Sequence, residues 1–201
     1  MRETIVLEAA TKNNKAVLNL TMIALFVSFT AVCAQISIPL PFTPVPRNLA
    51  LIMVFMSGYI MGSAKGAISP IIYVLLGCVG APVFAGFQGG LGIIIGSTGG
   101  YVVGYIAASF IVGLFVKNKR GAITVGLSMT SGLIACYFSG TLWFMISTKT
   151  NLLDALLMCV IPFLFGDILK IFLSVILSQR IKEMFSNRKG YIKKKSKNIK
   201  R

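Results

Sequence analysis

Residues 161–173, IPFLFGDILKIFL, place two charged side chains in a run that is otherwise apolar. Asp167 and Lys170 are three residues apart, so a helix puts both on one face, close enough to pair. A charge in membrane hydrocarbon costs roughly 2.5–3.5 kcal/mol on insertion scales, and such residues face a bundle interior or a wet cavity. The pair is therefore the first candidate for a ligand site. The alternative is a structural ion pair that neutralises itself within its own helix.

The composition of the whole chain agrees with a membrane location for this run. Of the 201 residues, 56% are hydrophobic and 12% are charged, and the mean hydropathy is +0.84. A soluble domain carries about 25% charged residues. We therefore predict an all-α integral membrane protein, with room for about six transmembrane helices of roughly 20 residues each.

Apolar runs and their interruptions divide the chain into six expected spans. They lie at about residues 17–38, 48–63, 67–83, 91–116, 122–146 and 152–181. A cytoplasmic segment (1–16) is expected before the transmembrane domain (17–182), and a basic cytoplasmic tail (183–201) after it. Pro162 is expected to kink the last span about one turn before Asp167.

Lysine and arginine are distributed unevenly. The net charge is +15, and eight basic residues fall between Arg188 and Arg201 with no acid among them. Six spans put both termini on one side, and the basic loops and tail fall there, whereas the opposite loops carry only Arg47 and Lys149. Positive charge marks the cytoplasmic side, so we predict a multi-pass cell-membrane protein with both termini in the cytoplasm. The tail is expected to contact anionic lipid, not nucleic acid.

Two loops are then expected to lie together on the outside. Residues 39–46 hold four prolines and predict an ordered loop, because proline cannot continue a helix. Residues 80–92 are rich in glycine, which allows close approach to a ligand, and contain phenylalanines that supply apolar walls. The ligand-contacting candidates in this second loop are Phe84, Phe87, Gly89 and Gly90. A flexible connector is the alternative.

Small residues recur every fourth position in the fourth expected span, at Gly92, Gly96, Gly100, Gly104 and Ala108. Such a ridge lets another backbone or a flat ligand lie against the helix, and packing is the expected job of most of its members. Gly99, Gly100 and Tyr101 are instead candidates for bounding a cavity, with the Tyr hydroxyl as a polar group. In the first span, Ala24 and Ser28 form a small-xxx-small step that suits either packing within the chain or docking to a partner subunit.

Chemistry is not expected from this chain. It has no histidine, and its four cysteines lie far apart in apolar runs, so we expect neither a metal nor a disulfide. No paired carboxylates at catalytic spacing, nucleophile motif or phosphate-binding loop are present. We therefore predict a protein that is not an enzyme and has no cofactor. Its site would offer Asp167 to N–H donors, with Lys170 either pairing with a ligand carboxylate or holding Asp167 ionised.

Several pieces of the sequence occur together in one known family. They are AQISIPLP (34–41), PVP (44–46), GAPVFAGF (80–87), GGLG (89–92), TGGY (98–101) and GD (166–167) with Lys170. In this order they resemble the BioY-type biotin transporters, which are substrate-binding S components of energy-coupling factor (ECF) transporters. The likeness spans about residues 24–180.

The resemblance implies a six-helix fold of the ECF S-component type and capture of biotin from the outside. It implies coupling to a membrane scaffold subunit and two cytoplasmic ATPases. It also implies that the small-residue face at Ala24 and Ser28 docks to a partner, and that Asp167 and Lys170 belong to the ligand site.

The chain departs from the family pattern after its Pro-x-Pro motif. A Thr and a Gln usually follow by two and four positions, and here those places hold Asn48 and Ala50. Asn48 still donates and accepts, so it stays a site candidate, whereas Ala50 does neither, and Arg47 is an added charge. Ser97 stands where a Pro is common. The alternatives to biotin capture are an S component for another vitamin or a biotin precursor, and a membrane assembly subunit that binds no ligand.

Overall fold

The computed structural model describes residues 2–40, 43–116 and 121–199, with side chains for residues 14, 16–38, 43–116 and 121–184. Its elements follow in the order α1 (Arg2–Gln35), β1 (Ser37–Leu40), β2 (Thr43–Asn48), α2 (Ala50–Met61), α3 (Ser63–Cys78), the 3-10 turn η1 (Ala85–Phe87), α4 (Leu91–Ile95), α5 (Gly99–Phe115), α6 (Ala122–Thr148), α7 (Leu152–Cys159) and α8 (Ile161–Ile199).

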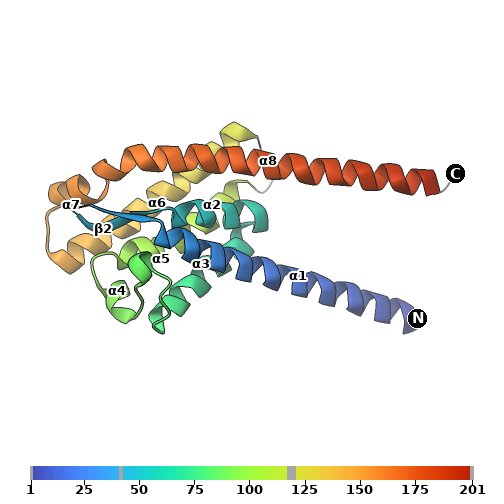
Figure 1. Cartoon of the computed structure of the whole chain (residues 1–201), viewed down its shortest axis with the longest axis horizontal. Coiled ribbons are helices and arrows are strands. Elements are labelled where there is room, and N and C mark those ends of the chain that lie inside the picture. Colours follow the sequence, from blue (N-terminus) through green and yellow to red (C-terminus); the bar gives the residue numbers. More distant parts are fainter. Residues whose placement is uncertain (1, 41–42, 117–120, 200–201) are drawn as a thin grey trace.

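The helices form an elongated bundle with both termini at one end (Figure 1). The hairpin, α4 and α7 lie at the opposite end. Among the described residues, three helical stretches are long and apolar enough to cross a membrane: Ala16–Gln35, Ala122–Thr148 and Ile161–Met184. The shorter apolar helices α2, α3 and α5 lie within the other three expected spans. The predicted all-α membrane class is confirmed, and six spans are compatible with these lengths.

The proline-rich stretch forms more than a loop. It is part of an antiparallel hairpin in which Ser37 pairs with Asn48, Ile38 with Arg47 and Leu40 with Thr43. The first span was expected to reach residue 38, but α1 ends at Gln35, because the chain turns there into extended backbone. Prolines fit a two-stranded ribbon, where only one edge of each strand needs its N–H groups.

Two predicted continuous spans are each broken in two. In the fourth, the helical pattern stops at Gly96, whose extended backbone (φ −69°, ψ −177°) separates α4 from α5. In the last, Val160 (φ −122°, ψ −58°) separates α7 from α8, so the kink expected at Pro162 is a full break. Pro162 is the second residue of α8, where its missing N–H leaves no helical bond unmade.

Glycines bring α5 and α6 into close contact at the centre of the bundle. A Cβ on Gly100 would lie 2.7 Å from the carbonyl oxygen of Ser139, and one on Gly104 would lie 3.1 Å from the Cα of Cys136. A Cβ on Gly132 would lie 2.9 Å from the carbonyl oxygen of Ala108. Gly104 therefore serves helix packing, as predicted for most of the ridge, and Gly100, a candidate for bounding a cavity, packs on α6 as well. All four cysteines are free.

Candidate functional site

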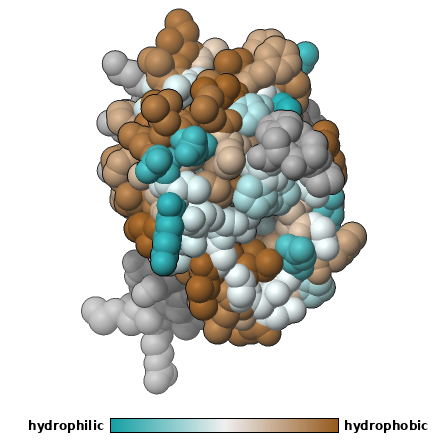
Figure 2. Space-filling view, turned by 90° about the vertical axis from the view of Figure 1, so that its left-hand side faces the viewer, coloured by the Kyte–Doolittle hydropathy of each residue, from teal (hydrophilic) through white to brown (hydrophobic). Residues whose placement is uncertain are grey.

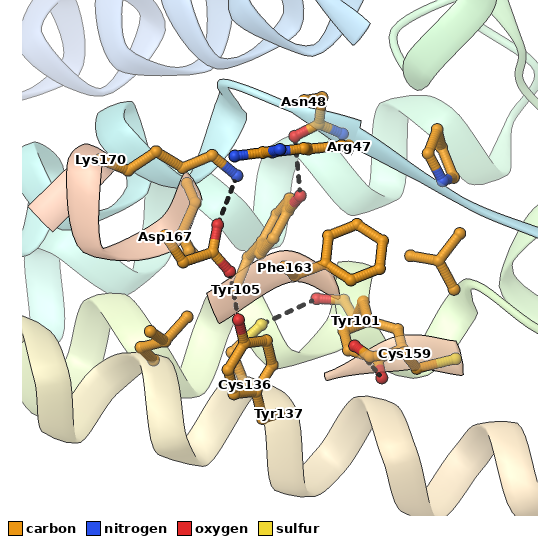
Figure 3. Close-up of a pocket in the computed structure, with 14 residues that line it drawn as sticks. Arg47, Asn48, Tyr101, Tyr105, Cys136, Tyr137, Cys159, Phe163, Asp167 and Lys170 are labelled. Atoms are coloured by element: carbon orange, nitrogen blue, oxygen red, sulfur yellow. Dashed lines mark hydrogen bonds and ion pairs between the residues drawn. The ribbon is translucent and has the colours of Figure 1, made fainter. Parts of the chain in front are cut away.

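Asp167 and Lys170 lie on the bundle-facing side of α8. Both are buried, at 4% and 7% exposure, and Lys170 Nζ lies 2.7 Å from Asp167 Oδ1. The second carboxylate oxygen, Oδ2, accepts a short hydrogen bond from the Tyr137 hydroxyl of α6 (Figure 3). Of the two contacts open to Lys170, the structure, which holds no ligand, has the one with Asp167.

Asn48 connects the hairpin to the start of α2 and to α5. Its Oδ1 accepts from the backbone N–H of Ala50 at 3.1 Å and from the Tyr105 hydroxyl at 3.3 Å. Ala50 is fully buried and lines none of the cavities described below. The position of the missing family glutamine therefore lies outside those cavity walls.

Tyr101 ties three helices together beneath the hairpin. Its hydroxyl lies 3.2 Å from Thr141 Oγ1 of α6 and donates to the carbonyl oxygen of Cys159 in α7 at 3.4 Å. A Cβ on Gly140 would overlap the Tyr101 ring, so this glycine makes room for the aromatic side chain. The ring position is thus fixed by packing from α6 and by polar contacts at its tip.

Two neighbouring cavities occupy the loop end of the bundle. A small one, of about 50 Å³, is lined by the ion pair together with residues of β2, α2, α5, α6, α7 and α8. A larger one, of about 320 Å³, lies beneath the two loops, and its aromatic lining consists of Tyr73, Phe84, Tyr101 and Tyr105. The lining shared by the two cavities is Val45, Pro46, Asn48, Tyr101 and Tyr105. Their combination of aromatic walls with a few polar groups is typical of a small-molecule site.

Figure 2 looks onto this end of the bundle. Paler, more hydrophilic residues gather in the middle of the face, and hydrophobic ones surround them. That distribution suits an opening toward water inside a lipid-facing belt.

Gln35, at the end of α1, holds the second loop over the larger cavity. Its Nε2 donates to the carbonyl oxygens of Val83 (3.3 Å) and Phe84 (3.1 Å), and its Oε1 accepts from the N–H of Phe87 at 2.8 Å. Phe84 is 2% exposed and stacks edge-on to Tyr73, with ring centroids 5.5 Å apart. The loop at residues 80–92 is therefore held in place by hydrogen bonds to its backbone and by the packing of the buried Phe84 ring.

Several predicted site residues lie outside both cavities. Phe87 is 72% exposed and does not line the cavity that Phe84 lines. A Cβ on Gly89 would lie 2.8 Å from the carbonyl oxygen of Gly80, and Gly90 has a φ of +100°, so both serve the loop's own conformation. Gly99 packs on α4, where a Cβ would overlap Ile94, and Gly100 packs on α6. The structure brings together Asp167, Lys170, Tyr101, Asn48 and Phe84.

Sequence reasoning missed four side chains around the ion pair. None of the four was a site candidate, yet the small cavity is lined by all of them: Tyr105, Cys136, Tyr137 and Phe163. One signal was available, since Tyr105 follows Tyr101 by one helical turn. The others depend on which face of each helix meets α8, and the apolar pattern of a buried helix does not show that.

Ala24 and Ser28 lie on an exposed face of α1, away from the cavities. The Ser28 hydroxyl donates to the carbonyl oxygen of Ala24 at 2.9 Å, within its own helix. Both side chains are small and make no demand for a polar partner, so this face presents a shallow surface to an approaching helix.

Comparison with known proteins gives consistent matches. The sequence profile of the BioY family matches residues 7–187. A probable biotin transporter BioY of Pyrococcus horikoshii is 38% identical over 161 residues, which cover 80% of this chain and 94% of that protein. The biotin transporter BioY of Thermotoga maritima is 34% identical over 161 residues, which cover 80% and 93%. The solved S-component for biotin from an ECF-type ABC transporter matches with a TM-score of 0.79 at 28% identity, covering 85% of this chain and 94% of that one.

Proposed function

The chain belongs to the BioY family, and from this membership we propose that it captures biotin at the outer face of the cell membrane for uptake. Its relatives are transporters, so the chain is a transport component and not an enzyme. The fold, which matches a biotin S-component, supports the same role.

The observation that carries the proposal is the buried Asp167–Lys170 pair beside an aromatic cavity. Biotin carries a ureido ring with N–H donors, a fused thioether ring and an acidic chain. Asp167, held by Lys170 and Tyr137, offers carboxylate oxygens as acceptors to ureido N–H groups. The rings of Tyr73, Phe84 and Tyr105 offer apolar walls for the fused bicycle.

Uptake would need an energy source outside this chain. The sequence has no ATP-binding loop, so we infer that a membrane scaffold subunit and two cytoplasmic ATPases drive release. Both termini lie at one end of the bundle (Figure 1). Eight of the basic residues fall in the C-terminal segment between Arg188 and Arg201. This supports a cytoplasmic position for both termini, with the cavities open to the outside.

The first test is mass spectrometry of the protein purified in detergent, followed by calorimetric titration with biotin. We expect bound biotin to accompany the protein, or one saturable site to appear. Asp167→Asn should weaken binding at least tenfold, about 1.4 kcal/mol, because the neutral amide is a poorer acceptor. Asp154→Asn is the matched control, since Asp154 is an exposed acid on α7 that lines neither cavity.

The outcomes separate the site from the substrate. Unchanged affinity in Asp167→Asn, with biotin still bound, would remove Asp167 from the ligand site. An empty site that binds dethiobiotin or another vitamin but not biotin would keep the fold and change the substrate. The departures at Asn48 and Ala50 make that second titration worthwhile.

A further inference from the structure

Arg47 is the site residue whose role the ion pair leaves unexplained. It is the next-to-last residue of β2, paired with Ile38 of β1, and it lines the small cavity together with Asp167 and Lys170. It also lines an adjoining hollow of about 280 Å³, between the hairpin and α8, and Lys170 lines that hollow as well. The guanidinium therefore lies where the hairpin meets the charged turn of α8.

Gly166 creates the place for the guanidinium. A Cβ at Gly166 would overlap the Nη2, Cζ and Nε atoms of Arg47, so the planar group lies directly against the backbone of α8. Figure 3 draws the Arg47 guanidinium edge-on above the Asp167–Lys170 pair. Any larger residue at position 166 would push it away. The guanidinium of Arg47 is the second cation of the site. It has a defined position against Gly166, the residue that precedes Asp167.

The charges around Arg47 do not balance. Asp167 and Lys170 neutralise each other at 2.7 Å. Within the part of the chain that the structure describes, the other ion pair is Arg180 with Glu183, so Arg47 has none there. The whole sequence has only five acids. The cavity therefore carries one net positive charge, half-buried and beside a second cation, and an anion bound there would relieve the repulsion.

We propose that Arg47 binds the carboxylate of the ligand's acidic chain and makes this site selective for a free carboxylate over an amide or ester. The inference rests on the proposed function and deepens it by naming the second polar anchor. The guanidinium is permanently charged and its planar fork matches the two oxygens of a carboxylate. The Lys170 ammonium has further N–H groups that can donate to a ligand, but Asp167 neutralises its positive charge. The net electrostatic attraction for an anion therefore comes from Arg47.

A different role for Arg47 is to lay its apolar stem on the bundle while its head reaches the membrane surface. In that role the guanidinium gains nothing from a ligand charge. The two roles therefore differ in one measurable respect: only the first makes the loss of Arg47 matter more for a charged ligand than for a neutral one.

The test is a two-by-two titration of the full-length protein in detergent. The unmutated protein and Arg47→Gln are each titrated with biotin and with biotinamide, which has a neutral amide of nearly the same shape. We expect the unmutated protein to bind biotin at least tenfold more tightly than biotinamide. Arg47→Gln should weaken biotin binding at least tenfold and change biotinamide binding by less than twofold.

Two further variants sharpen the result. Gly166→Ala keeps Arg47 but displaces its guanidinium, so it should reproduce the biotin-selective loss. Lys149→Asn is the control, because it removes an exposed cation that is expected on the same side of the membrane, at a left-handed position (φ 56°) that Asn tolerates. It should leave both affinities unchanged.

Equal weakening of biotin and biotinamide by Arg47→Gln would overturn this inference while the proposed function stands. Full retention of biotin affinity in Arg47→Gln would overturn it as well. Failure of the unmutated protein to bind either compound would contradict the proposed function itself, and the carboxylate role with it.

Discussion

The two oxygens of the Asp167 carboxylate are contacted from two different helices, and these contacts fix the orientation of the carboxylate. Lys170 contacts one oxygen from the same helix, and Tyr137 donates to the other from α6. The two contacts come from different helices, so the position of the carboxylate depends on how α6 packs against α8. The residue is thus prepared to accept further hydrogen bonds from a ligand.

Tyr137→Phe tests the contribution of the second helix. The change removes one O–H donor and keeps the ring, and a hydrogen bond to a charged group is worth about 1.5–3 kcal/mol. We expect biotin affinity to fall about tenfold, measured by calorimetry, with a lower midpoint of thermal unfolding. Thr130→Val is the control, because the Thr130 hydroxyl is exposed and bonds only to the Gly126 carbonyl of its own helix. Unchanged affinity in Tyr137→Phe would mean that Lys170 alone suffices to hold Asp167.

At the scale of elements, the pair α5 and α6 forms the framework beneath the cavities. Gly100, Gly104 and Gly140 bring the two backbones close, and Tyr101 takes the space that Gly140 leaves. Close backbone approach increases the van der Waals contact that stabilises helix pairs in lipid. Gly100, which the sequence analysis made a candidate for bounding a cavity, thus acts on the site indirectly, by bringing α5 against α6.

Gly100→Ala tests this packing. Its Cβ would meet the Ser139 carbonyl oxygen and the side chain of Trp143, so we expect a loss of about 1–3 kcal/mol from overpacking. Thermal unfolding in detergent should show a midpoint lower by about 5 °C. Gly126→Ala is the matched control on α6, where the nearest atom to a new Cβ is Val175 Cγ2 at 3.8 Å. That variant should be as stable as the parent or slightly more so, because alanine favours helix. Equal midpoints for the two variants would contradict the packing role.

At the scale of the whole molecule, the cavities and the small-residue face of α1 lie on separate surfaces. The cavities lie at one end of the bundle, whereas Ala24 and Ser28 face outward from α1. Such a separation allows a partner subunit to dock without covering the cavity mouth. Binding and coupling are therefore expected to respond to different mutations.

Ser28→Trp tests that separation. A bulky ring on the shallow face should keep a partner helix at a distance, so we expect biotin uptake by whole cells to fall at least tenfold. Biotin affinity of the purified protein should change by less than twofold, because the position lies away from both cavities. Phe29→Trp is the control, since Phe29 is already large and 49% exposed on the same helix. Loss of binding by Ser28→Trp in detergent would make this face structural instead.

Sequence alone determined the class of protein, the approximate spans and the central ion pair. Hydrophobic runs and charge asymmetry are local properties, and the cost of a charge in lipid forces Asp167 and Lys170 inward whatever the fold. Only the tertiary structure decided which residues meet that pair. The hairpin that carries Arg47 and the helix that carries Tyr137 lie far from Asp167 in the chain, and only their packing places the Arg47 guanidinium against Gly166. In a buried helix nearly every face is apolar, so hydropathy does not mark which face turns toward the ligand; contacts between helices decide it.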